Sequence, residues 1–191
     1  QGKQAKALEL TTRTAPLGDQ PPVVMQRPLV IVPGWKSTPD KFDALTHKLL
    51  ESGQNGSQVC YVKDGKFFGD GECTQTLDKP DSSNKIFQLV FGNIHQSPDE
   101  TAPQIAQSVE AIRKLTGTSQ VDALGYSMGG LATRLFLSQE AAAGSKTPPV
   151  NRLMLLGTPN HGTKFSDLAR HAVQRDIQWA MSMGGMAPID L

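Results

Sequence analysis

The sequence predicts an α/β protein with a doubly wound, mainly parallel β-sheet. Short, strongly apolar runs of the kind found in buried parallel strands alternate with longer segments of helical period. The segments between them are rich in turn-forming residues, and the 191-residue chain holds 18 glycines and 13 prolines. Strands that alternate with helices pair in parallel, because each helix carries the chain back across the sheet.

The elements follow in chain order. Residues 1–27 are polar, contain Pro21-Pro22 and predict an irregular arm, whereas residues 28–191 predict a single domain. Two β-prone runs around Asp64-Gly65 predict a β-hairpin within residues 57–69, inserted into that domain. Buried strands are expected at 29–32, 86–91, 121–126 and 150–157, and helices at 39–50, 103–116 and 128–143.

The segment Gly125-Tyr126-Ser127-Met128-Gly129 has the pattern of a nucleophile elbow. An apolar strand-like run precedes it and a helical pattern follows it, as the tight strand-to-helix turn of such an elbow requires. Glycine fits on either side because the turn leaves no room for side chains. We therefore expect Ser127 to be a catalytic nucleophile.

An elbow serine needs two backbone N–H groups to stabilise the oxyanion that forms when it attacks a carbonyl. The residue after the nucleophile, Met128, is the first expected donor. The second is expected from the loop after the first core strand, where Pro33-Gly34-Trp35 lies, and Trp35 is the candidate. The alternative is that Pro33-Gly34 is only a turn and Trp35 only packs.

These motifs, together with Leu156-Gly-Thr-Pro-Asn-His-Gly-Thr163, resemble the α/β-hydrolase superfamily and, more narrowly, bacterial lipase-like serine hydrolases. The resemblance covers about residues 28–165. It implies a three-layer α/β-hydrolase fold and a serine esterase or lipase acting on lipid or other acyl esters through an acyl-enzyme on Ser127. It also places Gly34, Tyr126 and His161 near the site. This sequence departs from the family in having Pro33 and Tyr126 where histidines are usual.

The resemblance further implies an acid and then a histidine, in that chain order, after later core strands. No strand-like run follows Gly157, so we expect the sheet to lack its C-terminal strands in this chain. The acid and base are then expected beyond Leu191 or on a second chain that completes the sheet. His161 and His171 are the only local histidines after the elbow, and both are weak candidates for the base. Possible partners to orient them are Asp167, Asp176 and Asp190.

Composition narrows the possible partners. A net charge of +1 with scattered basic residues gives no case for nucleic acid, and no apolar run is long enough to span a membrane. No cofactor is expected, and no metal site, since His161, Asp167 and His171 lack a recognised ligand spacing. Cys60 and Cys73 are compatible with a hairpin disulfide and equally with two free thiols.

A secreted, periplasmic or cell-surface bacterial location is expected from the start at Gln1-Gly2-Lys3, which has no initiating methionine, and from the family resemblance. The cytoplasm stays open as an alternative. Two other functions also stay open. One is a non-catalytic binding module that keeps the elbow as architecture, and the other is an acyltransferase that passes the acyl group to an alcohol.

Overall fold

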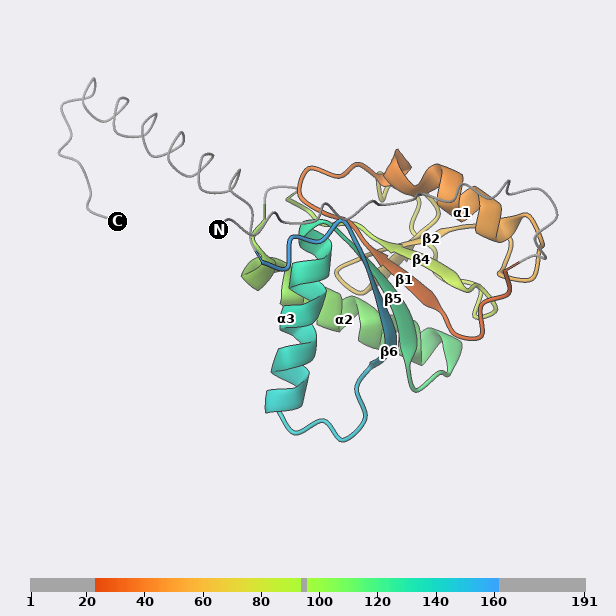
Figure 1. Ribbon diagram of the computed structural model, residues 1–191. Coiled ribbons are helices and arrows are strands. Elements are labelled where there is room, and N and C mark those ends of the chain that lie inside the picture. The colour runs from red at the N-terminus through yellow and green to blue at the C-terminus, as the bar shows by residue number, and fades with distance from the viewer. Residues whose placement is uncertain (1–22, 94–95, 162–191) are drawn as a thin grey trace, which may run out of the picture.

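A computed structural model describes residues 23–93 and 96–161, and the account below concerns those residues. They form a six-stranded sheet with the strand order β3-β2-β4-β1-β5-β6, in which every neighbouring pair except β2–β3 is parallel (Figure 1). The predicted mainly parallel, doubly wound sheet is therefore confirmed. The strands are β1 (Leu29–Val32), β2 (Cys60–Lys63), β3 (Lys66–Phe68), β4 (Ile86–Leu89), β5 (Val121–Tyr126) and β6 (Val150–Leu156).

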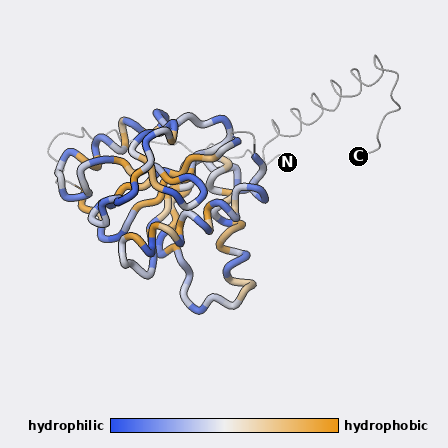
Figure 2. The backbone as a smooth tube through the Cα atoms, turned by 180° about the vertical axis from the view of Figure 1, so that it is seen from behind, coloured by the Kyte–Doolittle hydropathy of each residue, from blue (hydrophilic) through white to orange (hydrophobic). Residues whose placement is uncertain are grey.

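Helices cover both faces of this sheet. One face carries the 3-10 turn η1 (Pro39–Phe42) and helix α1 (Asp43–Leu50), and the other carries α2 (Pro98–Thr116) and α3 (Met128–Ala142) (Figure 1). Alternate residues of the central strand β1 belong to different hydrophobic clusters. Val30 and Val32 lie in the cluster with α2 and α3, whereas Leu29 and Ile31 lie in the cluster with α1. Burial on both faces explains why β1 is apolar throughout, and Figure 2 shows hydrophobic residues gathered along the middle of the fold.

Helix α2 begins at Pro98, five residues before the predicted start at Pro103, which lies inside the helix. The reason is a capping box at Ser97 and Glu100. The Ser97 N–H donates to the Glu100 carboxylate at 2.8 Å, and the Glu100 N–H donates to Ser97 Oγ at 3.4 Å. These bonds occupy two N–H groups that a helix N-terminus otherwise leaves unpaired. The hydrogen bond from the Ser97 backbone is the main cause of a lowered pKa of Glu100.

The predicted hairpin within residues 57–69 is formed by β2 and β3, and Asp64-Gly65 turns between them with φ of 49° and 71°. The hairpin extends the main sheet, because β2 also pairs in parallel with β4. The chain after β3 folds back on it. The Gly69 N–H donates to the Gln75 carbonyl and the Leu77 N–H donates to the Phe67 carbonyl, both at 2.9 Å.

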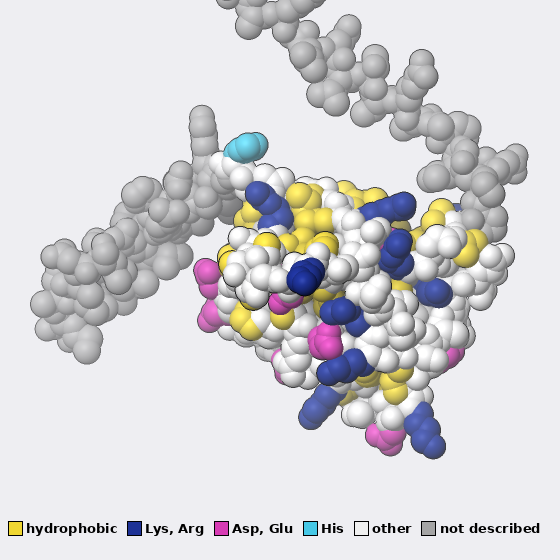
Figure 3. All heavy atoms as spheres, turned by 90° about the horizontal axis from the view of Figure 1, so that it is seen from below, with side chains coloured by type: hydrophobic (Ala, Val, Ile, Leu, Met, Phe, Trp, Pro, Cys, Tyr) yellow, Lys and Arg dark blue, Asp and Glu magenta, His cyan; other side chains and the backbone are white. Residues whose placement is uncertain are grey.

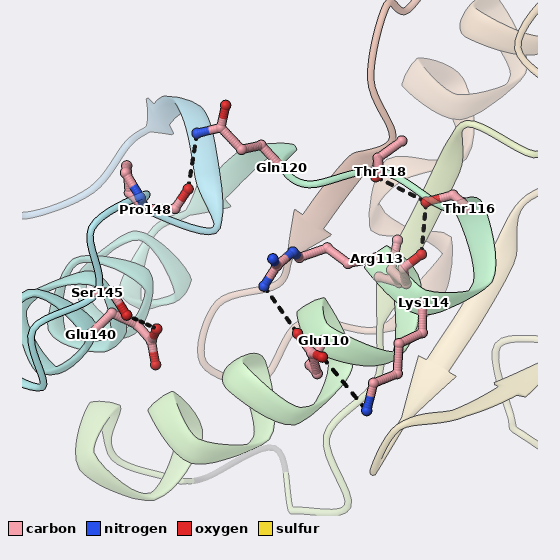
Figure 4. A network of polar contacts seen from close by, with 10 residues as sticks. Glu110, Arg113, Lys114, Thr116, Thr118, Gln120, Glu140, Ser145 and Pro148 are labelled. Carbon is pink, nitrogen blue, oxygen red and sulfur yellow. Dashed lines mark hydrogen bonds and ion pairs between the residues drawn. The ribbon is translucent and has the colours of Figure 1, made fainter.

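Polar contacts gather around the amino ends of β5 and β6, at the end of the sheet opposite the elbow (Figure 4). Gln120 Nε2 donates to the Pro148 carbonyl at 2.9 Å and links the approaches to these two strands. Arg113 and Lys114 both pair with Glu110 on the surface of α2. Such exposed pairs contribute little to stability, so this end of the molecule depends mainly on packing. No helix in the described ranges is both long and apolar enough to cross a membrane.

Candidate active site

Ser127 lies between the last residue of β5 and the first residue of α3, as expected of an elbow nucleophile. Its backbone has φ 51° and ψ −124°, a conformation that non-glycine residues rarely adopt. Two backbone bonds hold it there. The Ser127 N–H donates to the Leu156 carbonyl of β6 at 2.8 Å, and the Ser127 carbonyl accepts from the Gly130 N–H at 3.1 Å. The strained turn places the hydroxyl-bearing residue at the carboxyl end of the sheet.

The elbow glycines are required by close backbone contact. A Cβ on Gly125 would lie 2.5 Å from the Gly130 Cα, so strand and helix touch at this point. A Cβ on Gly129 would clash with the carbonyl oxygens of Val32 and Pro33. The helix that carries Met128 is therefore pressed against the loop that leaves β1.

The two predicted oxyanion donors lie on either side of this contact. Met128 is the first residue of α3, so its N–H has no carbonyl one turn earlier in the helix to bond. The loop after β1 passes beside the serine: a Cβ on Gly34 would lie 2.8 Å from both the Ser127 Cβ and the Tyr126 carbonyl oxygen. Trp35 follows directly, with its side chain 49% exposed and the Lys36 ammonium 4.5 Å from its ring centroid. The candidate oxyanion cradle is the space between these two segments.

A pocket of about 190 Å³ opens beside this cradle. Its walls come from the loop after β1, the end of β4 and the loop after it, the start of α3, and the loop after β3. The lining residues are Pro33, Gly34, Trp35, Ser37, Thr38, Pro39, Gly71, Glu72, Gln88, Leu89, Val90, Phe91, Asn93, Gln96, Thr101, Met128, Gly129 and Ala132. The helices after β1 and β4 cover opposite faces, so the pocket lies where ligands bind in doubly wound sheets.

Two further predicted site residues do not line this pocket, and neither does Ser127 itself. Tyr126 packs edge-on against Phe42, with ring centroids 5.6 Å apart, and does not line the pocket. His161 is exposed just after β6 and does not line it either. In the described part of the chain no acid or histidine is hydrogen-bonded to Ser127. His171, Asp167, Asp176 and Asp190 lie outside the described residues.

The cysteines are free thiols in this structure. Cys60 is completely buried on β2, and this burial raises its pKa to about 12. Nucleophilic cysteines instead have lowered pKa values, so Cys60 is a packing residue. Within residues 23–93 and 96–161 no group of three or more His, Cys, Asp or Glu side chains could hold a metal ion.

Sequence reasoning missed the polar lining of the pocket, which includes Glu72, Gln88 and Gln96. Gln88 could have been found, because a glutamine inside the apolar run 86–91 is unusual for a strand buried on both faces. Glu72 and Gln96 carry no such signal. They reach the pocket only through the path of the loops after β3 and β4.

Comparison with known proteins supports the fold. No curated protein was found to match the chain. Among solved structures it is similar to the lin2722 gene product of Listeria innocua, with 20% identity, a TM-score of 0.52, and coverage of 71% of this chain and 52% of that protein. A Lactobacillus plantarum WCFS1 protein, provisionally described as a cell surface hydrolase, is 24% identical with a TM-score of 0.49, over 70% of this chain and 53% of that one.

This chain therefore spans about half the length of each of these structures. At 20% identity the likeness to the Listeria innocua protein shows only a shared fold. A family model gives the assignment. Residues 22–183, most of the chain, match a family described as α/β hydrolases of unknown function, DUF915. The chain belongs to that family of α/β hydrolases.

Proposed function

We propose that the protein is a serine hydrolase that cleaves carboxylic esters of acyl groups through an acyl-enzyme on Ser127. The observation that carries this proposal is the strained conformation of Ser127 at the start of α3, with the loop after β1 beside it. A binding module has no need of a serine in a high-energy conformation, whereas strain of this kind is typical of residues that take part in chemistry.

The proposed reaction has two steps. Ser127 Oγ attacks the ester carbonyl carbon while a general base removes its proton, and the Met128 and Trp35 N–H groups stabilise the resulting oxyanion. Collapse of this intermediate breaks the bond to the alcohol, which leaves with a proton, and forms the acyl-enzyme. Water then attacks the acyl carbon, releasing the carboxylic acid and restoring the serine hydroxyl. We propose that the acid and base come from residues outside the described ranges or from a second chain.

The test is covalent labelling of the full-length protein with a fluorophosphonate, read by intact-mass spectrometry, beside ester turnover. We expect one adduct per chain, and we expect Ser127→Ala to lose both the adduct and the turnover. Removing the nucleophile of a hydrolytic triad typically lowers kcat by about 10⁶-fold. Ser138→Ala, an exposed serine on α3, is the matched control and should behave as wild type. Turnover that persists in Ser127→Ala would refute the proposal, and absence of any adduct in wild type would favour the binding module.

A further inference from the structure

We infer that Thr158, in the loop after β6, is a positioning residue that holds the elbow of Ser127 in its strained conformation. This inference rests on the proposed function and deepens it, because it names a side chain that keeps the nucleophile in place. It follows from the contacts of Thr158 with both the strand before Ser127 and the helix after it.

The conformation of Ser127 requires support from the residues around it. Its φ of 51° and ψ of −124° are rarely adopted by a non-glycine residue, and such a conformation persists only where the surrounding structure fixes it. The bond from the Gly130 N–H to the Ser127 carbonyl lies within the elbow itself. The bond from the Ser127 N–H to the Leu156 carbonyl comes from β6. The chain that leaves β6 therefore starts directly beside the nucleophile.

The half-buried side chain of Thr158 contacts both arms of the elbow. Its Oγ1 donates a hydrogen bond to the carbonyl of Gly125, on β5, at 3.4 Å. Its side chain also lies against Gly130 of α3, where an added Cβ would overlap Thr158 Oγ1 and lie 2.8 Å from Thr158 Cγ2. Gly125, Gly130 and Thr158 thus form one packed cluster that fixes the angle between β5 and α3, and Ser127 is the residue at that angle.

The loop that carries Thr158 is itself tied to α3. The Thr158 carbonyl accepts from the Asn160 N–H at 2.9 Å, and Asn160 Oδ1 accepts from Arg134 Nη1 at 2.7 Å. Arg134 lies on α3, about one turn after Gly130. Both Asn160 and Arg134 are exposed, so water competes for their bond, and we expect the contact at Gly130 to contribute more.

A change at Thr158 should affect the chemical step rather than substrate binding. Ser127 Oγ has to lie within attacking distance of an ester carbonyl held beside the loop after β1, and small displacements from this geometry lower the rate steeply. Thr158 does not line the pocket, so the contacts that would bind the ester remain when it is replaced. Loss of an interaction of this kind lowers kcat and leaves KM nearly unchanged.

The experiment compares Thr158→Val and Thr158→Ser in the full-length protein, with 4-methylumbelliferyl butyrate as substrate and the rate of fluorophosphonate labelling as a second readout. Valine keeps the shape of the side chain but cannot donate to Gly125. We expect it to lower kcat and the labelling rate by about tenfold, with KM within about twofold of wild type. Serine keeps the hydroxyl, so Thr158→Ser should restore most of both rates. A loss that serine does not restore would overturn the inference.

Thr116→Val is the matched control. Thr116 is also half-buried, and its Oγ1 donates to the Ile112 carbonyl at 2.8 Å, at the end of the sheet opposite the elbow (Figure 4). This variant loses the same kind of bond and should lower Tm, yet its kcat and labelling rate should match those of wild type. If Thr158→Val likewise lowers Tm but leaves kcat and labelling unchanged, Thr158 has only a structural role and the inference is overturned.

Failure of the inference and failure of the proposed function give different results. Turnover that depends on Ser127 but is unaffected by Thr158→Val overturns the inference and leaves the proposed function standing. Turnover that survives Ser127→Ala, or no turnover with no fluorophosphonate adduct, overturns the proposed function and the inference with it.

Discussion

Strands β1 and β6 are both rich in apolar residues, yet only β1 is enclosed. β1 lies between β4 and β5, and all four of its residues are buried. β6 pairs with β5 alone in the described part of the chain, and its Met154 and Leu156 side chains are 64% and 49% exposed. The difference shows that an apolar run predicts a strand but not its cover, which comes from neighbours elsewhere in the chain.

The site lies on the enclosed side of this comparison. Gly34 and the pocket adjoin β1 and β4, whereas β6 contributes only the Leu156 carbonyl that holds the Ser127 N–H. Figure 3 shows hydrophobic side chains gathered on the surface of the molecule, with lysine and arginine side chains around them. Strand β6 lies at the edge of the described sheet and exposes Met154 and Leu156. An apolar edge strand such as β6 invites pairing with another chain.

The largest effect is expected where strand and helix touch. Gly125→Val would place a branched side chain against the Gly130 backbone, which cannot move without separating β5 from α3. We expect a loss of about 3 kcal/mol or more in the free energy of unfolding, measured by urea titration with circular dichroism. Gly92→Ala, where a Cβ would meet only the flexible end of Lys63, should stay within about 0.5 kcal/mol. Equal losses in both would contradict the close contact.

The elbow was predictable because local sequence determines it: the glycines, the serine and the flanking periods all lie within a dozen residues. The buried strands at the sheet centre were predictable for the same reason. Ser97 and Glu100 signal the true start of α2, but Pro103 also suits a first helical position, so the prediction starts the helix five residues too late. The polar wall of the pocket was not predictable, since Glu72 and Gln96 come together only through tertiary contacts.

The next largest effect is expected at the centre of the sheet. Ile31→Ala removes a completely buried side chain from β1 and leaves a cavity beneath α1. We expect the free energy of unfolding to fall by about 2–5 kcal/mol, measured as above. A loss below about 1 kcal/mol would mean that α1 moves into the cavity left by the Ile31 side chain. The expected difference in stability cost between the enclosed strand β1 and the edge strand β6 would then disappear.

A smaller effect is expected at the capping box of α2, the helix that covers the sheet centre. Ser97→Ala should cost about 0.5–2 kcal/mol. A smaller part of this difference depends on pH, because the Ser97 hydroxyl, which the variant lacks, donates to the Glu100 carboxylate at 3.1 Å and adds to the lowering of the Glu100 pKa by the Ser97 backbone N–H, which the variant keeps. The contribution of this hydroxyl bond is present above the unfolded pKa and is lost as pH falls through the lowered folded value. Urea titrations of both proteins at neutral and acidic pH measure this. A difference that does not shrink in acid would contradict the role of the Glu100 carboxylate.

The smallest effect is expected on the exposed face of β6. Met154→Ala should change the free energy of unfolding by no more than about 0.5 kcal/mol, because its side chain is already largely in water. Leu153→Ala, one residue earlier on the opposite face, is the matched control and should cost more, since Leu153 packs against the core with α2 and α3. Both are measured by urea titration, with sizing chromatography to follow self-association. A cost for Met154→Ala in the full-length protein as large as that of Ile31→Ala would break the comparison, and it would mean that residues outside the described ranges cover this face.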